Sequence, residues 1–209
     1  AEADHKIIQV GHIERFNPAF LHVKNQNLAP KFVEIHRLAP FNPRGTDVPV
    51  ILDLMIHDID ILLSMVNSTV KDIQASGVKV VSKTVDIANA RISFENGCVA
   101  NITASRISQG PMRKMRIFQE ATYITVDFLN KSVEVYHVED ELPADVDENS
   151  VFPLEGHDKK YIIYEKPEVL EHNALREELH HFATVIQQGE QPDVDGQSAA
   201  DALHVALEI

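Results

Sequence analysis

Val48–Val66 carries the sequence VPVILDLMIHDIDILLSMV, in which apolar residues fill almost every position. Four polar side chains fall within about 60° of one another on a helical wheel drawn at 100° per residue: Asp53, His57, Asp60 and Ser64. We therefore expect a helix that is buried all round except for one polar stripe. Carboxylates and an imidazole are costly to bury unless they are paired, ligated or facing a wet cleft. The stripe predicts a functional cleft.

Three interpretations of this stripe stay open from the residues alone. Asp53, His57 and Asp60 could form a satisfied polar network in a core helix, because structural networks also bury such groups. Asp53 and His57 could share a metal ion, although no clear third ligand presents itself. They could also perform acid–base catalysis. Asp58 points into the apolar face of the same helix, and its partner cannot be named from the sequence.

Composition and charge exclude several classes of protein. The 209 residues include 44% hydrophobic and 24% charged residues, which is typical of a globular protein with a real core. The formal net charge of −13, without a basic cluster, argues against nucleic acid or an anionic membrane as a partner. No apolar run approaches the roughly 18 residues that span a bilayer. The single cysteine, Cys98, fits a reducing cytosol, so we expect a cytoplasmic protein.

The periodicity along the chain predicts one α+β domain, a broad and mostly antiparallel sheet with helices packed on one face. The clearest local signal is a hairpin around Asn96-Gly97, a pair that favours a two-residue type I′ turn. Residues 139–158 are acidic and aperiodic, which is typical of a surface excursion. We expect the other strands at 6–13, 31–38, 73–81, 112–119, 123–128, 132–138 and 161–164, and helices at 18–23, 51–66, 168–188 and after Asp195.

Three segments, in this order, resemble the Gfo/Idh/MocA family of nicotinamide-dependent sugar and cyclitol dehydrogenases. VGHIERFNPAF at 10–20 resembles the segment that joins the dinucleotide-binding domain to the substrate domain, and DLMIHDIDIL at 53–62 resembles the D-x-x-x-H helix of the substrate domain. EELHHFATVIQQGEQPDVDGQSAADALHVALEI at 177–209 is similar to the closing helix, Gly-Glu-x-Pro turn and final helix. The likeness is greatest to members that act on nucleotide sugars.

The resemblance implies a fold like the C-terminal domain of glyceraldehyde-3-phosphate dehydrogenase. The chain begins without Met and stops within a helical pattern, so we expect a fragment that lacks the N-terminal Rossmann domain. Residues 1–15 would be a crossover strand left from that domain, and residues 16–209 the substrate-binding and oligomerisation domain. A homodimer or homotetramer would form through the open face of the sheet.

The resemblance also implies an NAD(P)-dependent enzyme that oxidises a sugar or nucleotide-sugar hydroxyl to a ketone by hydride transfer. None of the eight glycines forms the G-x-G-x-x-G turn, so this fragment has no cofactor-binding residues and should be inactive alone, with NAD or NADP bound only by the intact protein. Glu165-Lys166-Pro167 spells the family's E-K-P motif far out of order, and we reject Lys166 as its catalytic lysine.

Within the resemblance, His57 is the expected acid/base, because an imidazole with a pKa near ~6.5 suits proton transfer at neutral pH. Asp53 would orient its ring or hold a substrate hydroxyl. No metal is expected, since the family does not depend on one. Arg15 could bind a carboxylate or phosphate, or could instead form a salt bridge between elements. The residues expected near the substrate are Glu14, Arg15, Asn17 and Asp60, with helix capping the favoured role for Asn17.

Two competing functions belong to other classes. A non-catalytic sugar-binding or regulatory relative would keep the sheet without redox activity, and a dimerisation module would need neither cofactor nor substrate. Retention of both Asp53 and His57 at one helical turn favours the dehydrogenase.

Overall fold

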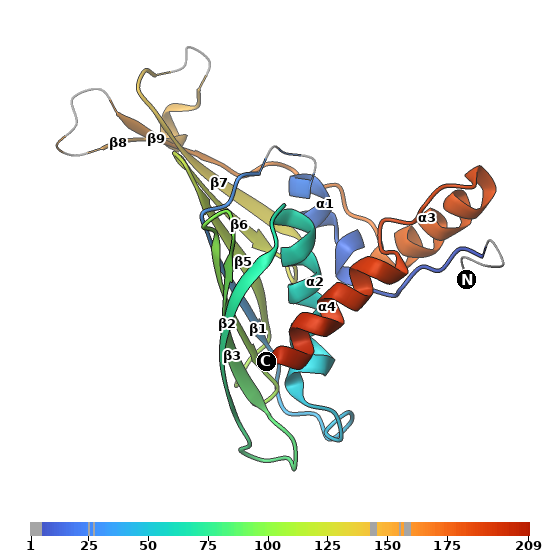
Figure 1. Cartoon of the computed structure of the whole chain (residues 1–209). Helices are drawn as coiled ribbons and strands as arrows, with labels where there is room; N and C mark the ends of the chain where they lie inside the picture. The colour runs from blue at the N-terminus through green and yellow to red at the C-terminus, as the bar shows by residue number, and fades with distance from the viewer. Residues whose placement is uncertain (1–5, 25, 27, 143–145, 155, 157–159) are drawn as a thin grey trace.

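The computed structural model describes residues 6–24, 26, 28–142, 146–154, 156 and 160–209. One sheet dominates it, with the strand order β2-β3-β4-β1-β5-β6-β7-β9-β8 (Figure 1). Neighbouring strands run antiparallel except β1 and β4, which are parallel, so the expected mostly antiparallel sheet is confirmed. The strands are β1 (Phe32–Leu38), β2 (Val70–Val78), β3 (Ile87–Phe94), β4 (Val99–Ser105), β5 (Met112–Gln119), β6 (Thr122–Asp127), β7 (Ser132–Glu139), β8 (Val151–Pro153) and β9 (Tyr161–Glu165).

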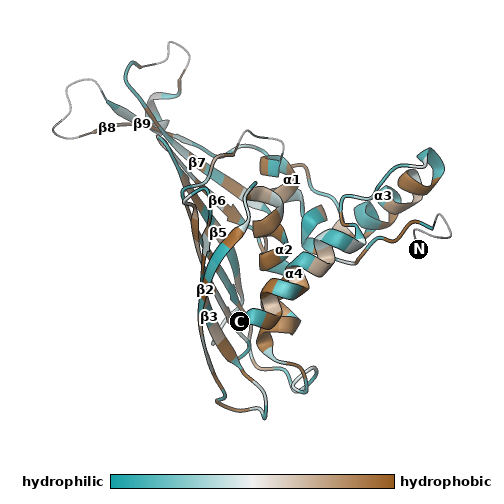
Figure 2. Ribbon diagram, viewed as in Figure 1, coloured by the Kyte–Doolittle hydropathy of each residue, from teal (hydrophilic) through white to brown (hydrophobic). Residues whose placement is uncertain are grey.

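The helical elements lie on one face of this sheet (Figure 1). The main core includes Ile35 of β1, Ile59 of α2 and Met115 of β5. Figure 2 shows that hydrophobic residues lie on both the strands and α2. None of the helices in the described ranges is long and apolar enough to cross a membrane. The helical elements are η2 (Ile13–Phe16), α1 (Pro18–Lys24), η3 (Ile51–Met55), α2 (Ile56–Met65), η4 (Glu148–Ser150), α3 (Ala174–Gln188) and α4 (Gly196–Glu208).

The strand expected at Lys6–Ile13 is wrong. Residues 6–12 have no regular secondary structure, and a 3₁₀ turn, η2, follows them. This segment lies on the helix side of the sheet, where Val10 donates one backbone hydrogen bond to Val194 and the Gln9 amide donates to the Glu178 carbonyl. Apolar residues on both faces of a short segment predict a buried strand, but a strand also needs a row of neighbouring backbone groups to pair with.

The turn at Asn96-Gly97 and the excursion at 139–158 both differ from the sequence prediction. At the Asn96-Gly97 hairpin only Gly97 has a positive φ, at 84°, whereas a type I′ turn needs two such residues. Phe94 accepts from the Gly97 N–H and donates to Cys98, which closes a three-residue loop with a glycine bulge instead. Within the expected surface excursion at 139–158, β8 pairs with β9, and positions 143–145, 155 and 157–159 lie outside the described residues.

Helix α3 exposes most of the apolar side chains that recur along it at helical spacing. It begins at Ala174, where the Asn173 side chain caps the Arg176 N–H, and not at Glu168 as expected. Leu175, Leu179 and Ile186 are between 53% and 62% exposed. The side chains that α3 buries are Glu178 and Val185, on a neighbouring face that packs near η2.

Candidate functional site

The N-terminal segment is fixed to the fold at Asn17. Its side-chain oxygen accepts from the Ala19 N–H, and Pro18 occupies the first position of α1, as capping predicts. The same amide donates to the Glu14 carboxylate and to the backbone carbonyl of Phe128. All the polar atoms of this side chain are therefore used within the protein, and the capping role expected for Asn17 is confirmed.

The helix that carries Asp53 and His57 begins with a π-helical turn that the sequence did not reveal. In η3 the chain follows i→i+5 bonding, and the Ile56 N–H donates to the Ile51 carbonyl. The regular α-helix α2 starts only at Ile56. Because the π turn adds a residue to the first turn, Asp53 and His57 are not spaced as on the α-helical wheel. Single π turns inside helices are frequent at functional sites.

A buried ionic cluster lies between this helix and the sheet. Arg37 of β1 donates through Nε and Nη2 to the two carboxylate oxygens of Asp58, at 2.8 and 2.7 Å. Its Nη1 donates at 2.8 Å to Glu14, which also accepts from the more exposed Arg113 at 3.2 Å. Arg37, Asp58 and Glu14 are each less than 9% exposed, so this is a desolvated ion cluster. Asp58 thus has its partner, 21 residues away along the chain.

Burial acts first to raise the pKa of Glu14, but the attraction and hydrogen bond of Arg37, helped by Arg113 and Asn17, outweigh it and lower that pKa. Burial likewise acts to lower the pKa of Arg37, and its paired carboxylates, Asp58 first, raise it overall. Glu14 and Arg37 are therefore both charged at neutral pH. Ionised Glu14 stabilises the folded state fully at a pH above its ordinary pKa of 4.5. This contribution to the free energy of unfolding is lost as the pH falls through the lower pKa of Glu14 in the folded protein.

A second buried pair divides the polar stripe expected on α2. Asp60 accepts from Nε and Nη2 of Arg15 at 2.7 and 3.0 Å, and both side chains are buried. Arg15 therefore forms the salt bridge between elements that was one of its two expected roles. Ser64 is exposed and donates to the Ile61 carbonyl. Of the stripe, His57 has no hydrogen-bond partner at Nδ1, and Asp53 has only a longer contact to a buried cation, 3.7 Å from Arg106.

His57 lies half-buried at the start of α2, against His12 from the N-terminal segment. The two rings meet edge to face, with centroids 5.7 Å apart and planes at 79°. The Nδ1 atoms of both rings are sealed from solvent and have no hydrogen-bond partner. Burial, then the positive charge of Arg37, lowers the pKa of His57 below its ordinary 6.5, with Asp58 and Glu14 partly opposing. His57 is therefore neutral at pH 7 and able to accept a proton.

Asp53 is exposed, one helical turn before His57, and faces the loop before the helix. Its carboxylate lies 3.7 Å from Nη2 of Arg106 and is the nearest group to a side chain added at Gly45. Arg106 itself is buried and donates to the carbonyls of Gly45 and Val48. The carboxylate of Asp53 is thus oriented by a fixed guanidinium and remains open to a ligand.

The other functional groups considered from the sequence are a metal site, Lys166 and a dinucleotide-binding site. In the described ranges no three His, Cys, Asp or Glu side chains are grouped to hold a metal ion. Lys166 follows β9 and pairs with Glu134 at 3.8 Å, away from His57. The sequence lacks a glycine-rich G-x-G-x-x-G turn, and the part of the chain that the structure describes has no parallel βαβ unit, so these residues do not fit a dinucleotide.

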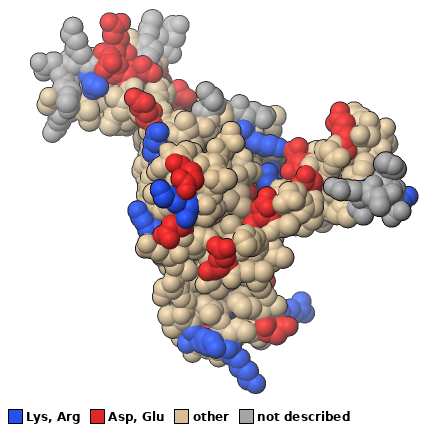
Figure 3. Space-filling view, viewed as in Figure 1, with Lys and Arg blue, Asp and Glu red and all other residues tan. Residues whose placement is uncertain are grey.

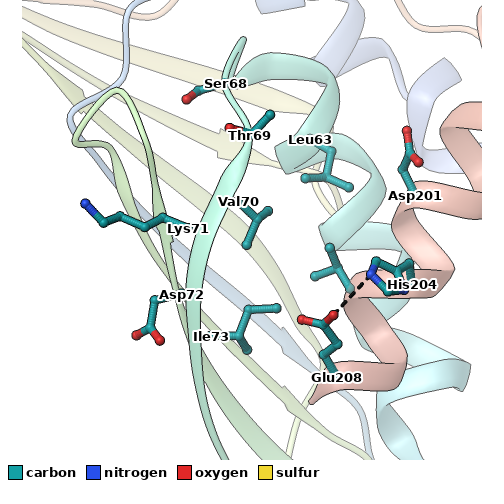
Figure 4. Close-up of a pocket in the computed structure, with 11 residues that line it drawn as sticks. Leu63, Ser68, Thr69, Val70, Lys71, Asp72, Ile73, Asp201, His204 and Glu208 are labelled. Carbon is teal, nitrogen blue, oxygen red and sulfur yellow. Dashed lines mark ion pairs between the residues drawn. The ribbon is translucent and has the colours of Figure 1, made fainter.

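A cavity of about 500 Å³ opens between the edge strand β2, α2 and α4, and it contains neither His57 nor Asp53 (Figure 4). Apolar side chains such as Val70 and Ile73 lie on one side of it. Its polar groups, including the pair His204 and Glu208 at 3.1 Å, are largely exposed. We place the candidate site at His57 because the buried, unpaired imidazole nitrogens and the shifted pKa occur there.

Sequence reasoning missed three residues that define this site. His12 lies within the VGHIERF segment without a signal of its own, and the sequence fits Arg37 to a position near a substrate as well as to an ordinary cross-strand charge pair. Asp58 had no nameable partner. The alternation of β1 could have shown that Arg37 shares the core face with Val33 and Ile35, which requires a buried counter-charge.

Comparisons with known proteins identify the fold. Residues 20–125 match the family model described as GFO/IDH/MocA C-terminal domain. A UDP-N-acetylglucosamine 3-dehydrogenase of Acidithiobacillus ferrooxidans is 43% identical over 138 residues, which cover 66% of this chain and 44% of that protein. A solved structure of UDP-N-acetylglucosamine 3-dehydrogenase from the same organism has a TM-score of 0.87 at 34% identity, covering all of this chain and 63% of its own.

A dehydrogenase from Clostridium difficile has the same fold, with a TM-score of 0.74 at 17% identity, covering 99% of this chain and 62% of that one. This chain therefore spans less than two thirds of the length of these relatives.

Removal of Arg37 should strongly destabilise the fold. Arg37→Met leaves Asp58 and Glu14 charged and buried without their cation, so we expect the free energy of unfolding in urea to fall by about 3–5 kcal/mol. Arg91→Met is the matched control, because Arg91 is exposed on β3 and should change the same quantity by less than about 0.5 kcal/mol. Equal effects of the two substitutions would show that the buried cluster contributes nothing particular.

Proposed function

Because this chain belongs to the Gfo/Idh/MocA family through its C-terminal domain, we propose that it is the substrate and oligomerisation domain of a dehydrogenase. The intact protein would oxidise a sugar or nucleotide-sugar hydroxyl to a ketone. The observation that carries this proposal is His57, a half-buried imidazole with a lowered pKa on the helix that follows a π turn. Oxidation of a hydroxyl to a carbonyl needs a group that removes the hydroxyl proton, and a neutral imidazole suits that task.

Each candidate residue then has a defined task. His57 accepts the hydroxyl proton at Nε2, and Asp53, whose carboxylate stays open beside Arg106, holds a neighbouring hydroxyl of the sugar. Glu14, Arg15, Asn17 and Asp60 direct their polar atoms to one another and to the backbone, so in this proposal they support the site and do not bind substrate.

The redox partner would be NAD or NADP, which dehydrogenases of this family typically use. The residues of this chain do not fit a dinucleotide, so the cofactor would be held by a domain of the intact protein outside this chain. A fragment without that domain should have no dehydrogenase activity.

The substrate class is proposed from the relatives. The matched relatives of 43% and 34% identity both act, by their names, on UDP-N-acetylglucosamine, so we propose a UDP-sugar as the substrate of the intact protein. A cytoplasmic location would suit both a nucleotide sugar and the buried single thiol of Cys98.

We further propose that the open face of the sheet pairs with a second copy. Five half-buried aromatic side chains form a row across it, with successive ring centroids 4.7 to 5.6 Å apart: Phe32, Phe118, Tyr123, Tyr136 and Tyr164. A row of stacked aromatic side chains is the kind of surface that interfaces use. In the view of Figure 3, acidic side chains gather near β8 and β9.

The catalytic proposal predicts a large loss of activity without His57. In the intact protein, His57→Ala should lower kcat/KM for a UDP-sugar by about 10²-fold or more, followed by nicotinamide absorbance. Activity of the unmodified protein should fall with decreasing pH through a pKa below 6.5, because protonation removes the base. Lys166→Ala is the control and should leave activity unchanged. Full activity of His57→Ala, with the fold intact, would remove His57 from the mechanism.

The oligomer proposal predicts that a charge placed in the aromatic row disrupts assembly. We expect light scattering after size exclusion to give the mass of at least a dimer for the unmodified chain and a monomer for Tyr136→Arg. Gln197→Arg, on the exposed side of α4, should keep the larger mass. A monomeric unmodified chain, or no change with Tyr136→Arg, would contradict the use of this face.

A further inference from the structure

The contact between His12 and His57 carries an inference about how the proposed base is prepared. His12 is 5% exposed and comes from the segment just before η2, whereas His57 comes from the first turn of α2. Their rings meet edge to face at 5.7 Å. Each ring has its Nδ1 sealed from solvent without a hydrogen-bond partner, while neither Nε2 is sealed in this way. Two orphaned nitrogens on touching rings are unusual, because buried polar atoms are nearly always paired.

The acidic groups around His57 cannot supply the missing partner. Both oxygens of Asp58 accept from Arg37, and both oxygens of Asp60 accept from Arg15. Glu14 accepts from Arg37 and Arg113 with one oxygen and from Asn17 with the other. Each of these carboxylates could turn to His57 only by breaking a buried ion pair or hydrogen bond, which costs several kcal/mol for a buried pair.

The partner of Nδ1 decides what Nε2 can do. A neutral imidazole carries its proton on one nitrogen and a lone pair on the other. A base that accepts a hydroxyl proton at Nε2 must carry its own proton on Nδ1, and a buried N–H without an acceptor is costly. Left without an acceptor, His57 would place its proton on Nε2 and could only donate there. A basic His57 therefore requires an acceptor beside its Nδ1.

We propose that His12 is a positioning residue that accepts the Nδ1–H of His57 and so fixes the tautomer whose Nε2 is basic. This hydrogen bond requires the two edge-to-face rings to rotate so that their sealed nitrogens face each other. His12 keeps its own proton on Nε2, outside the sealed region. When substrate reacts, its O–H bond breaks and an N–H bond forms at Nε2 of His57, while the Nδ1–H remains on His57 and bonded to His12. The value of this tautomer for catalysis rests on the proposed function, but the contact itself does not.

The tautomer of His57 can be measured directly in this chain. In ¹⁵N-histidine-labelled protein, long-range ¹H–¹⁵N spectra report which ring nitrogen carries the proton, at a pH about 1.5 units above the ordinary histidine pKa. The His57 signals are assigned from their loss in His57→Gln. We expect the Nδ1–H form in the unmodified chain, and the Nε2–H form in His12→Leu, which offers no acceptor. His12→Asn places an amide oxygen near the Nδ1 position and should restore the Nδ1–H form.

The same variants in the intact protein separate this inference from the proposed function. His12→Leu should lower kcat by about 10- to 10²-fold with little change in KM, and His12→Asn should recover most of it. If His12→Leu changes the tautomer of His57 but the intact protein oxidises no UDP-sugar, the role of His12 is supported and the proposed function is rejected. The same His57 tautomer in the unmodified chain, His12→Leu and His12→Asn would overturn the inference, whatever the activity. Circular dichroism melting shows whether each variant is folded. If His12→Leu unfolds, the tautomer of His57 in His12→Asn still tests the inference, because an Nε2–H form there would contradict it.

Discussion

Arg37 lies on a strand near the middle of the sheet, on the face that the helices cover. A guanidinium buried there without counter-charges would be too costly to keep, so the fold must bring carboxylates to it. One comes from α2 as Asp58 and another from the N-terminal turn as Glu14. The pair of Arg15 and Asp60 joins these same two elements a second time. The position of α2 and of the segment before α1 therefore follows from where this charge can be neutralised.

The site depends on this arrangement in two ways. The ionic cluster holds the N-terminal segment against the start of α2, which puts His12 and His57 in contact. It also occupies the oxygens of Asp58, Asp60 and Glu14, so that the two imidazoles meet without a carboxylate free to bond either ring. Desolvation beside Arg37 then keeps His57 neutral near pH 7. One cluster thus provides both a structural anchor and the electrostatic setting of the proposed base.

The sequence predicted features that depend on neighbouring residues and missed those that depend on distant ones. Strand β5 has the expected bounds, and the caps at Asn17 and Asp195 form as expected, because alternation and capping are local. The partners of Arg37 and Arg15 lie 21 to 45 residues away, and no periodicity reports them. The polar residues expected to form one stripe do not share one environment. Asp60 pairs with the buried Arg15, which is distant in sequence, and the π turn changes the position of Asp53 relative to His57. Apolar spacing also could not show that α3 leaves Leu175 and Leu179 exposed.

The central claim is that buried charge pairs, more than apolar packing, fix the N-terminal turn to α2. A double-mutant cycle on Arg15 and Asp60 tests it most directly, because these two side chains form a buried bidentate pair. With Arg15→Ala, Asp60→Ala and the double variant, urea unfolding should give a coupling free energy of about 1–3 kcal/mol. Additive effects, with a coupling below about 0.5 kcal/mol, would contradict the claim.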